Sequence, residues 1–205
     1  MITPRFLDLR TARLCLREFR REDAPAVQRL ADDPGVAEGT LLPHPYRPGI
    51  AEAWIARQAA AFAAGREVNF AIERGTDAAL LGAAGLEIDA ANARAKLGFW
   101  IGRPHWGQGY CTEAAGAIVA YGFQSLGLQR ICTPRFRWNA ASARVLEKLG
   151  FWREGCRRDY VPARGRIEIV ETHGLLRWEW ETQREQHGID PAARSLAESE
   201  FGRAA

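Results

Sequence analysis

Lysine is nearly absent from this sequence: only Lys96 and Lys148 occur, so arginine carries almost all of the positive charge. The 28 basic residues are nearly matched by 25 acidic residues, and the net charge at pH 7 is +3. Nucleic-acid-binding domains usually concentrate a larger basic excess on one face. The charge balance therefore requires no polyanionic partner, and an arginine-rich RNA-binding domain is a weak alternative.

Paired cysteines and long apolar runs are also missing. No Cys-x-x-Cys pair or nearby histidine cluster occurs, which argues against a disulfide scaffold and a zinc site. No apolar run reaches the roughly 18 residues of a membrane-spanning helix, and the first residues do not resemble a signal peptide. We expect a cytoplasmic protein with no metal ion, no membrane partner and reduced cysteines at Cys15, Cys111, Cys132 and Cys156.

The composition fits one compact α+β domain, because 205 residues with 47% hydrophobic content can bury a sizeable core. Turn signals separate three strand-like segments at 67–74, 79–89 and 95–102, which predicts an antiparallel meander. Helical patterns cover residues 21–34, 50–65, 112–125 and 139–150, with strands at 13–19, 128–136 and on both sides of 163–166. The strand–helix–strand order after residue 102 predicts one parallel pair in a mixed sheet. We expect a domain over residues 1–182 and a loose helix or disordered tail over residues 183–205.

A glycine-bearing loop, "HWGQGYCTEA", stands directly before the helical segment at 112–125. The first turn of a helix leaves backbone N–H groups unpaired, and residues such as Gly107 and Gly109 let an anion approach them closely. The loop is not a P-loop, because no Gly-Lys-Ser/Thr follows, and it lacks the third glycine of a dinucleotide fingerprint. Taken alone, it is either a turn or a diphosphate site.

Two sequence blocks favour the second interpretation. "KLGFWIGRPHWGQGYCTEA" followed by "WNAASARVLEKLGFWREG" resembles the GCN5-related N-acetyltransferase (GNAT) superfamily, and within it the ribosomal-protein N-terminal acetyltransferases. The resemblance implies a cofactor cleft between central strands of a mixed sheet with helices on both faces. It also implies acetyl-CoA held by the loop, with the pantetheine arm along the strand "LGFWIG". Trp106 stands where the superfamily pattern has Gln or Arg, and Cys111 stands at a small-residue position. The implied cofactor residues are Ile101, Gly107, Gln108, Gly109, Tyr110, Cys111, Thr112, Asn139 and Ser142.

The second block bears on the chemistry of transfer. Asn139 and Ser142 suit the N-terminus of a helix as capping residues, whereas the resemblance places both beside the coenzyme. Many family members have a tyrosine before "EKLGF" that protonates the departing thiolate, but this chain has Leu146. Ser142 is the first candidate to replace it and water the second. Both options are chemically reasonable, because a thiolate with a pKa near 8.5 is a tolerable leaving group.

The general base has several candidates. Glu87 could hold a water at the acceptor side, and Asp159 lies near the position where some family members have an acidic base. Charged strand residues usually face solvent, so an ordinary surface role is the alternative for each of them. Three further candidates lie on the last strand, namely Glu168, Glu171 and His173.

The sequence thus predicts an acetyl-CoA-dependent N-acetyltransferase that acts as a monomer or homodimer. The acceptor stays open between a protein N-terminus and a small amine such as a polyamine, an amino sugar or an amino acid. The loop "LLPHPYRPG" and the last strands are expected to shape that choice. A non-catalytic acyl-CoA-binding module is the alternative, for which Leu146 is the best support.

Overall fold

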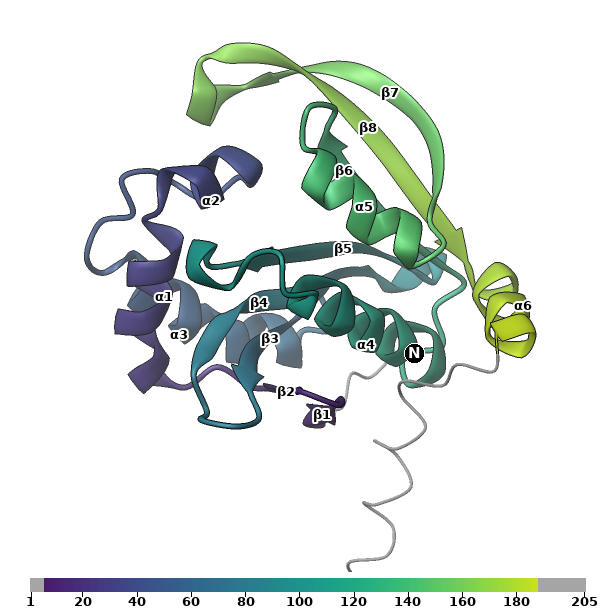
Figure 1. Ribbon diagram of the computed structural model, residues 1–205, viewed down its shortest axis with the longest axis horizontal. Helices are drawn as coiled ribbons and strands as arrows, with labels where there is room; N and C mark the ends of the chain where they lie inside the picture. Colours follow the sequence, from purple (N-terminus) through teal and green to yellow (C-terminus); the bar gives the residue numbers. More distant parts are fainter. Residues whose placement is uncertain (1–5, 188–205) are drawn as a thin grey trace, which may run out of the picture.

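A computed structural model describes residues 6–187, and its centre is one mixed sheet of eight strands (Figure 1). The strand order is β1-β2-β3-β4-β5-β6-β8-β7, and only the β5–β6 pair is parallel. This confirms the predicted meander, the parallel pair and the α+β class. The strands are β1 Leu9–Arg10, β2 Leu14–Arg17, β3 Glu67–Arg74, β4 Leu80–Asp89, β5 Arg94–Ile101, β6 Arg130–Phe136, β7 Trp152–Val161 and β8 Arg166–Leu176.

Helices cover both faces of the sheet, as predicted. Alternate residues of β3 and β4 point to opposite sides, so Phe70 and Leu86 pack with α4 while Ala71 and Ala83 pack with α1 and α3. The helices are α1 Ala24–Ala31, α2 Pro34–Gly39, α3 Ile50–Ala63, α4 Tyr110–Gln124, α5 Ala140–Lys148 and α6 Arg177–His187. Short 3₁₀ turns are η1 Arg21–Asp23, η2 Ala90–Asn92, η3 Arg103–His105 and η4 Pro162–Arg164.

The two central strands β5 and β6 separate after a short paired segment. Their register contains only Arg94 with Arg130, Ala95 with Ile131, and Lys96 with Cys132. Beyond Lys96, β5 continues to Ile101 while pairing only with β4. The open edge of β5 and the unpaired half of β6 therefore lie where the resemblance predicts the cofactor cleft.

Two parts of the chain differ from the sequence-based expectation. Residues 34–39, of which the expected helix covered only Pro34 and the rest had no assigned element, form the separate helix α2. Helix α6 runs to His187, past the expected domain boundary at residue 182, and the rest of the expected tail lies outside the described residues. Within residues 6–187, no helix is long and apolar enough to cross a membrane.

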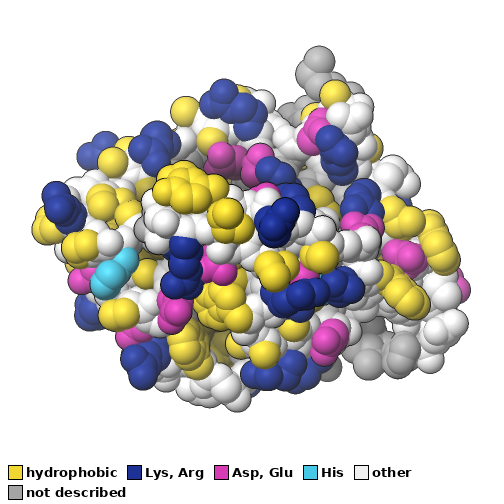
Figure 2. Space-filling model, turned by 90° about the horizontal axis from the view of Figure 1, so that it is seen from above, with side chains coloured by type: hydrophobic (Ala, Val, Ile, Leu, Met, Phe, Trp, Pro, Cys, Tyr) yellow, Lys and Arg dark blue, Asp and Glu magenta, His cyan; other side chains and the backbone are white. Residues whose placement is uncertain are grey.

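Charge is mixed over the surface. On the face shown in Figure 2, basic side chains are spread out with acidic side chains between them. This distribution matches the nearly balanced composition, and the visible face shows no extended basic patch of the kind that nucleic-acid binding uses.

Candidate active site

The glycine loop lies between the end of β5 and the first turn of α4. Gly107 has φ +74° and Gly109 has φ +81°, a region that glycine enters without steric cost. Gly109 is the N-cap of the 15-residue helix α4, so the unpaired amides of the first turn follow it immediately. A Cβ at Gly107 would meet no atom within 4 Å, which leaves open space in front of the loop. The loop therefore has the conformation and the free volume that an anion at a helix N-terminus needs.

Arg13, in the turn between β1 and β2, holds this loop in place through its side chain. Its Nη1 donates to the carbonyl of Gln108 at 2.9 Å, and its guanidinium lies over the Tyr110 ring, 4.6 Å from the centroid. Its Nε and Nη2 both lie 2.7 Å from Oε2 of Glu113 in the first turn of α4. The loop and the helix are thus held by one side chain from about a hundred residues earlier in the sequence.

Glu113 is the anionic end of this arrangement. Its Oε1 accepts from the Thr11 hydroxyl at 2.6 Å and from the Arg13 amide at 2.9 Å. Burial alone would raise the pKa of Glu113, but the hydrogen bonds from Thr11 and Arg13 outweigh it and hold that pKa below its usual range. The carboxylate is therefore ionised at neutral pH, where it also complements the positive end of the helix dipole.

Removing the Arg13 side chain should weaken coenzyme binding. We expect Arg13→Ala to raise KM for acetyl-CoA about 5- to 10-fold with little change in kcat, because a charged hydrogen bond of about 1–1.5 kcal/mol no longer orders the loop. Steady-state kinetics at saturating amine measures both constants. Arg94→Ala is the control, because Arg94 forms a similar ion pair with Asp89 at a distance from the loop. An unchanged KM, or the same rise in both variants, would contradict the positioning role.

Trp106 explains how the loop tolerates the absence of the usual Gln or Arg. Its indole N–H donates to the carbonyl of Ile101 at 2.6 Å, closing the loop onto the end of β5. Its ring packs against α2, where a Cβ at Gly35 would lie 3.1 Å from Cη2 of Trp106. Trp106 therefore links the loop to β5 and α2 by a contact that no Gln or Arg pattern would have predicted.

The edge of β5 beyond Lys96 has backbone groups that no neighbouring strand pairs with. The amide of Gly102 donates to Leu81 on β4, so by strand alternation the N–H groups of Phe99 and Ile101 point to the opposite, unpaired edge. Ile101 is itself buried, so only its backbone is available there. This edge is suited to pair with the amides of an extended arm, as an added strand does.

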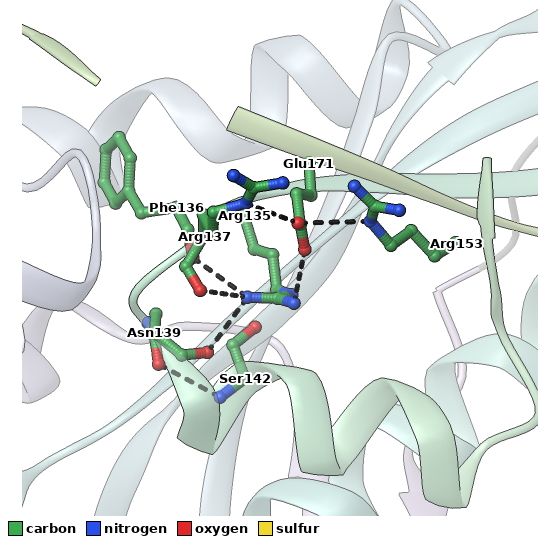
Figure 3. Close-up of polar contacts among 7 residues, drawn as sticks. All are labelled: Arg135, Phe136, Arg137, Asn139, Ser142, Arg153 and Glu171. Carbon is green, nitrogen blue, oxygen red and sulfur yellow. Dashed lines mark hydrogen bonds and ion pairs between the residues drawn. The ribbon is translucent and has the colours of Figure 1, made fainter. Parts of the chain in front are cut away.

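The N-terminus of α5 stands at the diverging end of β6. The Asn139 side chain caps the helix by accepting from the Ser142 amide at 3.0 Å, so the capping interpretation of Asn139 is confirmed (Figure 3). Its amide group donates to the carbonyl of Gly39 at the end of α2, 3.2 Å away. Figure 3 draws the Ser142 hydroxyl with no bond to the other residues shown. Helix capping is thus compatible with the predicted role beside the coenzyme, because capping uses the Ser142 amide and leaves the Ser142 hydroxyl available.

An ion network around the buried carboxylate of Glu171 supports this helix start (Figure 3). Arg135 of β6 donates through Nη1 to the carbonyls of Phe136 and Arg137, at 3.0 and 2.9 Å, and at 3.5 Å to that of Asn139. Its Nη2 lies 2.6 Å from Glu171 of β8. Arg137 and Arg153 reach the other oxygen of the same carboxylate, at 3.0 and 3.1 Å. Glu171 therefore neutralises part of a cluster of three arginines and is fully engaged.

The candidate bases all have partners or lie away from solvent. Glu87 is exposed and pairs with Lys96 at 3.1 Å, where β5 is still joined to β6. Asp159 pairs with Arg157 at 2.9 Å on the edge strand β7. His173 is buried at 4% exposure, and burial, together with the charge of Arg135, lowers its pKa. The structure does not bring Glu87 and Asp159 together, and their role as bases stays a prediction.

Two other sequence features turn out to be core positions. Leu146 is fully buried against α4 and the sheet, so the place of the missing tyrosine is filled by apolar packing. Cys111 packs against the same core, and burial raises the pKa of its thiol to about 12. Only the backbone of Cys111 can therefore serve the loop, and its thiol stays protonated.

Comparisons with known proteins agree with this geometry. A family model described as an acetyltransferase (GNAT) domain matches residues 13–152. The chain belongs to the GNAT acetyltransferase family. The uncharacterized N-acetyltransferase p20 of Bacillus licheniformis is 34% identical over 173 residues, which cover 84% of this chain and 97% of that protein. YdaF of Bacillus subtilis, provisionally named a ribosomal N-acetyltransferase, is 32% identical over 97 residues, covering 47% of this chain and 53% of YdaF.

The fold of this GNAT acetyltransferase is shared with solved structures. A spermidine N-acetyltransferase from Vibrio cholerae, solved in complex with CoA and spermine, matches with a TM-score of 0.71 at 22% identity, over 82% of this chain and 98% of that one. Family membership makes the chain an acetyl-CoA-dependent N-acetyltransferase. The residues present fit that coenzyme, because the two positive-φ glycines leave room before the α4 amides and β5 has an open edge.

Proposed function

We propose that this acetyltransferase moves the acetyl group directly to an amine that enters between α2 and the β7–β8 hairpin. The observation that carries the proposal is the early separation of β5 and β6, with the glycine loop at the end of β5 and the N-terminus of α5 at the end of β6. A thioester and an amine brought together there need no covalent enzyme intermediate. The four free cysteines therefore need no nucleophilic role.

Each part of the site has a proposed role that follows from its position. When bound, acetyl-CoA supplies an activated thioester whose C–S bond breaks as the acceptor nitrogen forms the new C–N bond. The amides after Gly109 hold the diphosphate, and the free edge of β5 at Phe99 and Ile101 aligns the pantetheine arm. The start of α5 directs its partial positive charge and the Ser142 hydroxyl at the reacting end. The amine gives up one proton to water, with Glu87 or Asp159 as the predicted relays, and the thiolate takes one.

Ser142 is the proposed donor of that proton, because Leu146 cannot donate one. We expect Ser142→Ala to lower kcat about 10-fold with a smaller change in KM for acetyl-CoA. A weak acid assisting a tolerable leaving group should contribute less than the roughly 100-fold or more that is typical of general acids. The measurement is thiol release at saturating substrates. Ser142→Thr should retain most of the rate because it keeps the hydroxyl. A normal kcat in Ser142→Ala would indicate that water, and not Ser142, protonates the thiolate.

The decisive test of the function is thiol release from acetyl-CoA, with pooled free-N-terminus peptides and small amines offered to the purified protein. Release that depends on an amine, with acetylated product identified by mass spectrometry, is the expected result. Coenzyme binding without release under any amine would instead favour the non-catalytic module, for which the buried Leu146 is the one supporting observation.

A further inference from the structure

A pocket of about 310 Å³ lies between α2 with the loop that follows it and the turn that joins β7 to β8. In Figure 1 these two parts face each other at one end of the molecule. One wall is formed by Arg164 and Arg166, and the opposite wall includes Glu38 and His44. Pro34, Ala37, Thr40 and Leu42 complete the lining. The pocket thus lies between the two segments that the sequence predicts to select the acceptor.

Arg164 is held rigidly in this wall. Its guanidinium lies 4.1 Å from the centroid of Phe136 and 5.3 Å from that of Trp138, and these two rings stack on each other. Its Nη1 is 3.1 Å from Glu168, whereas its Nη2 is buried and has no hydrogen-bond partner among the described residues. A buried guanidinium donor without an acceptor is costly, so this atom indicates an oxygen ligand that the protein itself does not provide.

The wall keeps an excess of positive charge. Arg164 and Arg166 share a single oxygen of Glu168, whose other oxygen accepts from the Trp138 indole at 3.2 Å. The hydrogen bond from Arg166 lowers the pKa of Glu168 and outweighs its burial, so this carboxylate is ionised and already engaged. One guanidinium charge is therefore not neutralised in this wall of the pocket. The neighbouring Glu171 network adds three more arginines against one carboxylate.

The opposite wall connects the pocket to the start of α5. Glu38 lines the pocket and forms no ion pair within residues 6–187. The next residue, Gly39, accepts a hydrogen bond from Asn139, three residues before Ser142. A ligand that spans the pocket would therefore meet a free carboxylate near the transfer site and an arginine pair at the far side.

We propose that the acceptor is an amine that also carries an anionic oxygen group, a carboxylate or a phosphate, bound by Arg164 and Arg166 while its nitrogen lies toward Glu38 and α5. This inference rests on the proposed function and names its acceptor class. It predicts that amino acids, peptides and phosphorylated amines are preferred as acceptors over polyamines. Polyamines have no anionic group to bind the arginine wall, and their positive charges are repelled by it.

The test compares matched acceptors by thiol release. The first pair is a dipeptide with a free C-terminal carboxylate and the same dipeptide as its amide. The second pair is O-phosphoethanolamine and ethanolamine. Spermidine is the cationic reference. In one pair, we expect kcat/KM for the anionic member to be at least 10-fold higher than for its uncharged counterpart. The pair that shows this difference identifies the anionic group as a carboxylate or a phosphate. Equal rates within both pairs, or a preference for spermidine, would overturn the inference.

Two variants assign the preference to the pocket. The Arg166 side chain is about half exposed, so Arg166→Gln should not disturb the fold. It should reduce the preference for the anionic acceptor at least 5-fold, with KM for acetyl-CoA unchanged. Arg164→Met should abolish the preference. Arg158→Gln is the matched control, because Arg158 is an exposed arginine on the same hairpin and outside the pocket lining. If no amine is turned over, the proposed function fails, and calorimetric binding of the same probes with CoA present decides the acceptor class. Anionic binding lost in Arg166→Gln then supports the inference, and binding without charge preference overturns it.

Discussion

Gly109→Val is expected to raise the Kd for acetyl-CoA about 10- to 100-fold, equivalent to about 1.4–2.8 kcal/mol, while the protein stays folded. Gly109 has φ +81°, where a β-branched residue is strained by about 1–3 kcal/mol. A Cβ there would lie 3.3 Å from Nη2 of Arg13, so the valine methyl groups would displace the side chain that holds the loop. They would also cover the first amides of α4. Titration of acetyl-CoA by calorimetry, with circular dichroism for the fold, measures both effects.

Gly127→Val separates binding from strain. Gly127 also has positive φ, at +67°, with no atom within 4 Å of an added Cβ, and it follows the other end of α4. Its replacement should cost a similar amount of stability without changing coenzyme affinity. Equal affinity in Gly109→Val and the wild type would show that the glycine loop is a turn with no part in binding.

The fold was predictable because its signals are local. Turn residues after Arg74 and Asp89 mark the meander, and the change from period two to helical periodicity after Gly102 marks the parallel crossover. The glycine loop was predictable for the same reason, since glycines, helix start and strand end lie within ten residues. Local patterns such as these need no knowledge of which strands become neighbours.

The sequence does not predict helix α2, because the residues that start it also resemble the end of a helix. Asp33-Pro34-Gly35 resembles the end of the preceding helix, yet the Asp33 carboxylate caps a new one by accepting from the amides of Gly35 and Val36 at 2.8 and 3.4 Å. Proline at the first helical position loses no hydrogen bond there. The same tripeptide can thus end one helix and begin the next, and one wall of the acceptor pocket depends on which occurs.

The ion networks of the site could not be predicted, because their partners are far apart in sequence. Arg13 meets Glu113 only because the β1–β2 turn lies beside the start of α4, and Arg135 meets Glu171 because β6 and β8 are neighbours while β7 is outermost. The sequence alone therefore leaves Glu171 as a possible base. In the structure both of its carboxylate oxygens have arginine partners, and a role as base stays a prediction.

Glu171→Ala is accordingly expected to destabilise the protein by about 3–5 kcal/mol, because removing one partner of a buried ion pair leaves the other uncompensated. The side chains of Glu171 and Arg135 are only 6% and 10% exposed. Chemical denaturation followed by tryptophan fluorescence measures the change. Glu154→Ala is the control, since Glu154 pairs with Arg130 at the surface and exposed pairs contribute about 0–1 kcal/mol. Equal losses in the two variants would contradict the structural role.

The pH dependence of this loss gives an independent check. Burial alone would raise the pKa of Glu171, but Arg137, Arg135 and Arg153 outweigh it and lower that pKa below its unfolded value. A lowered folded pKa means that the contribution is fully present above the unfolded pKa of about 4.3 and is lost as pH falls through the folded value. The stability gap between wild type and Glu171→Ala should therefore be constant near neutral pH and shrink below about pH 4. Because Arg135 also holds the carbonyls that lead to Asn139, the variant should lose kcat at pH values where it is still folded, which connects the buried carboxylate to the helix start at the site of transfer.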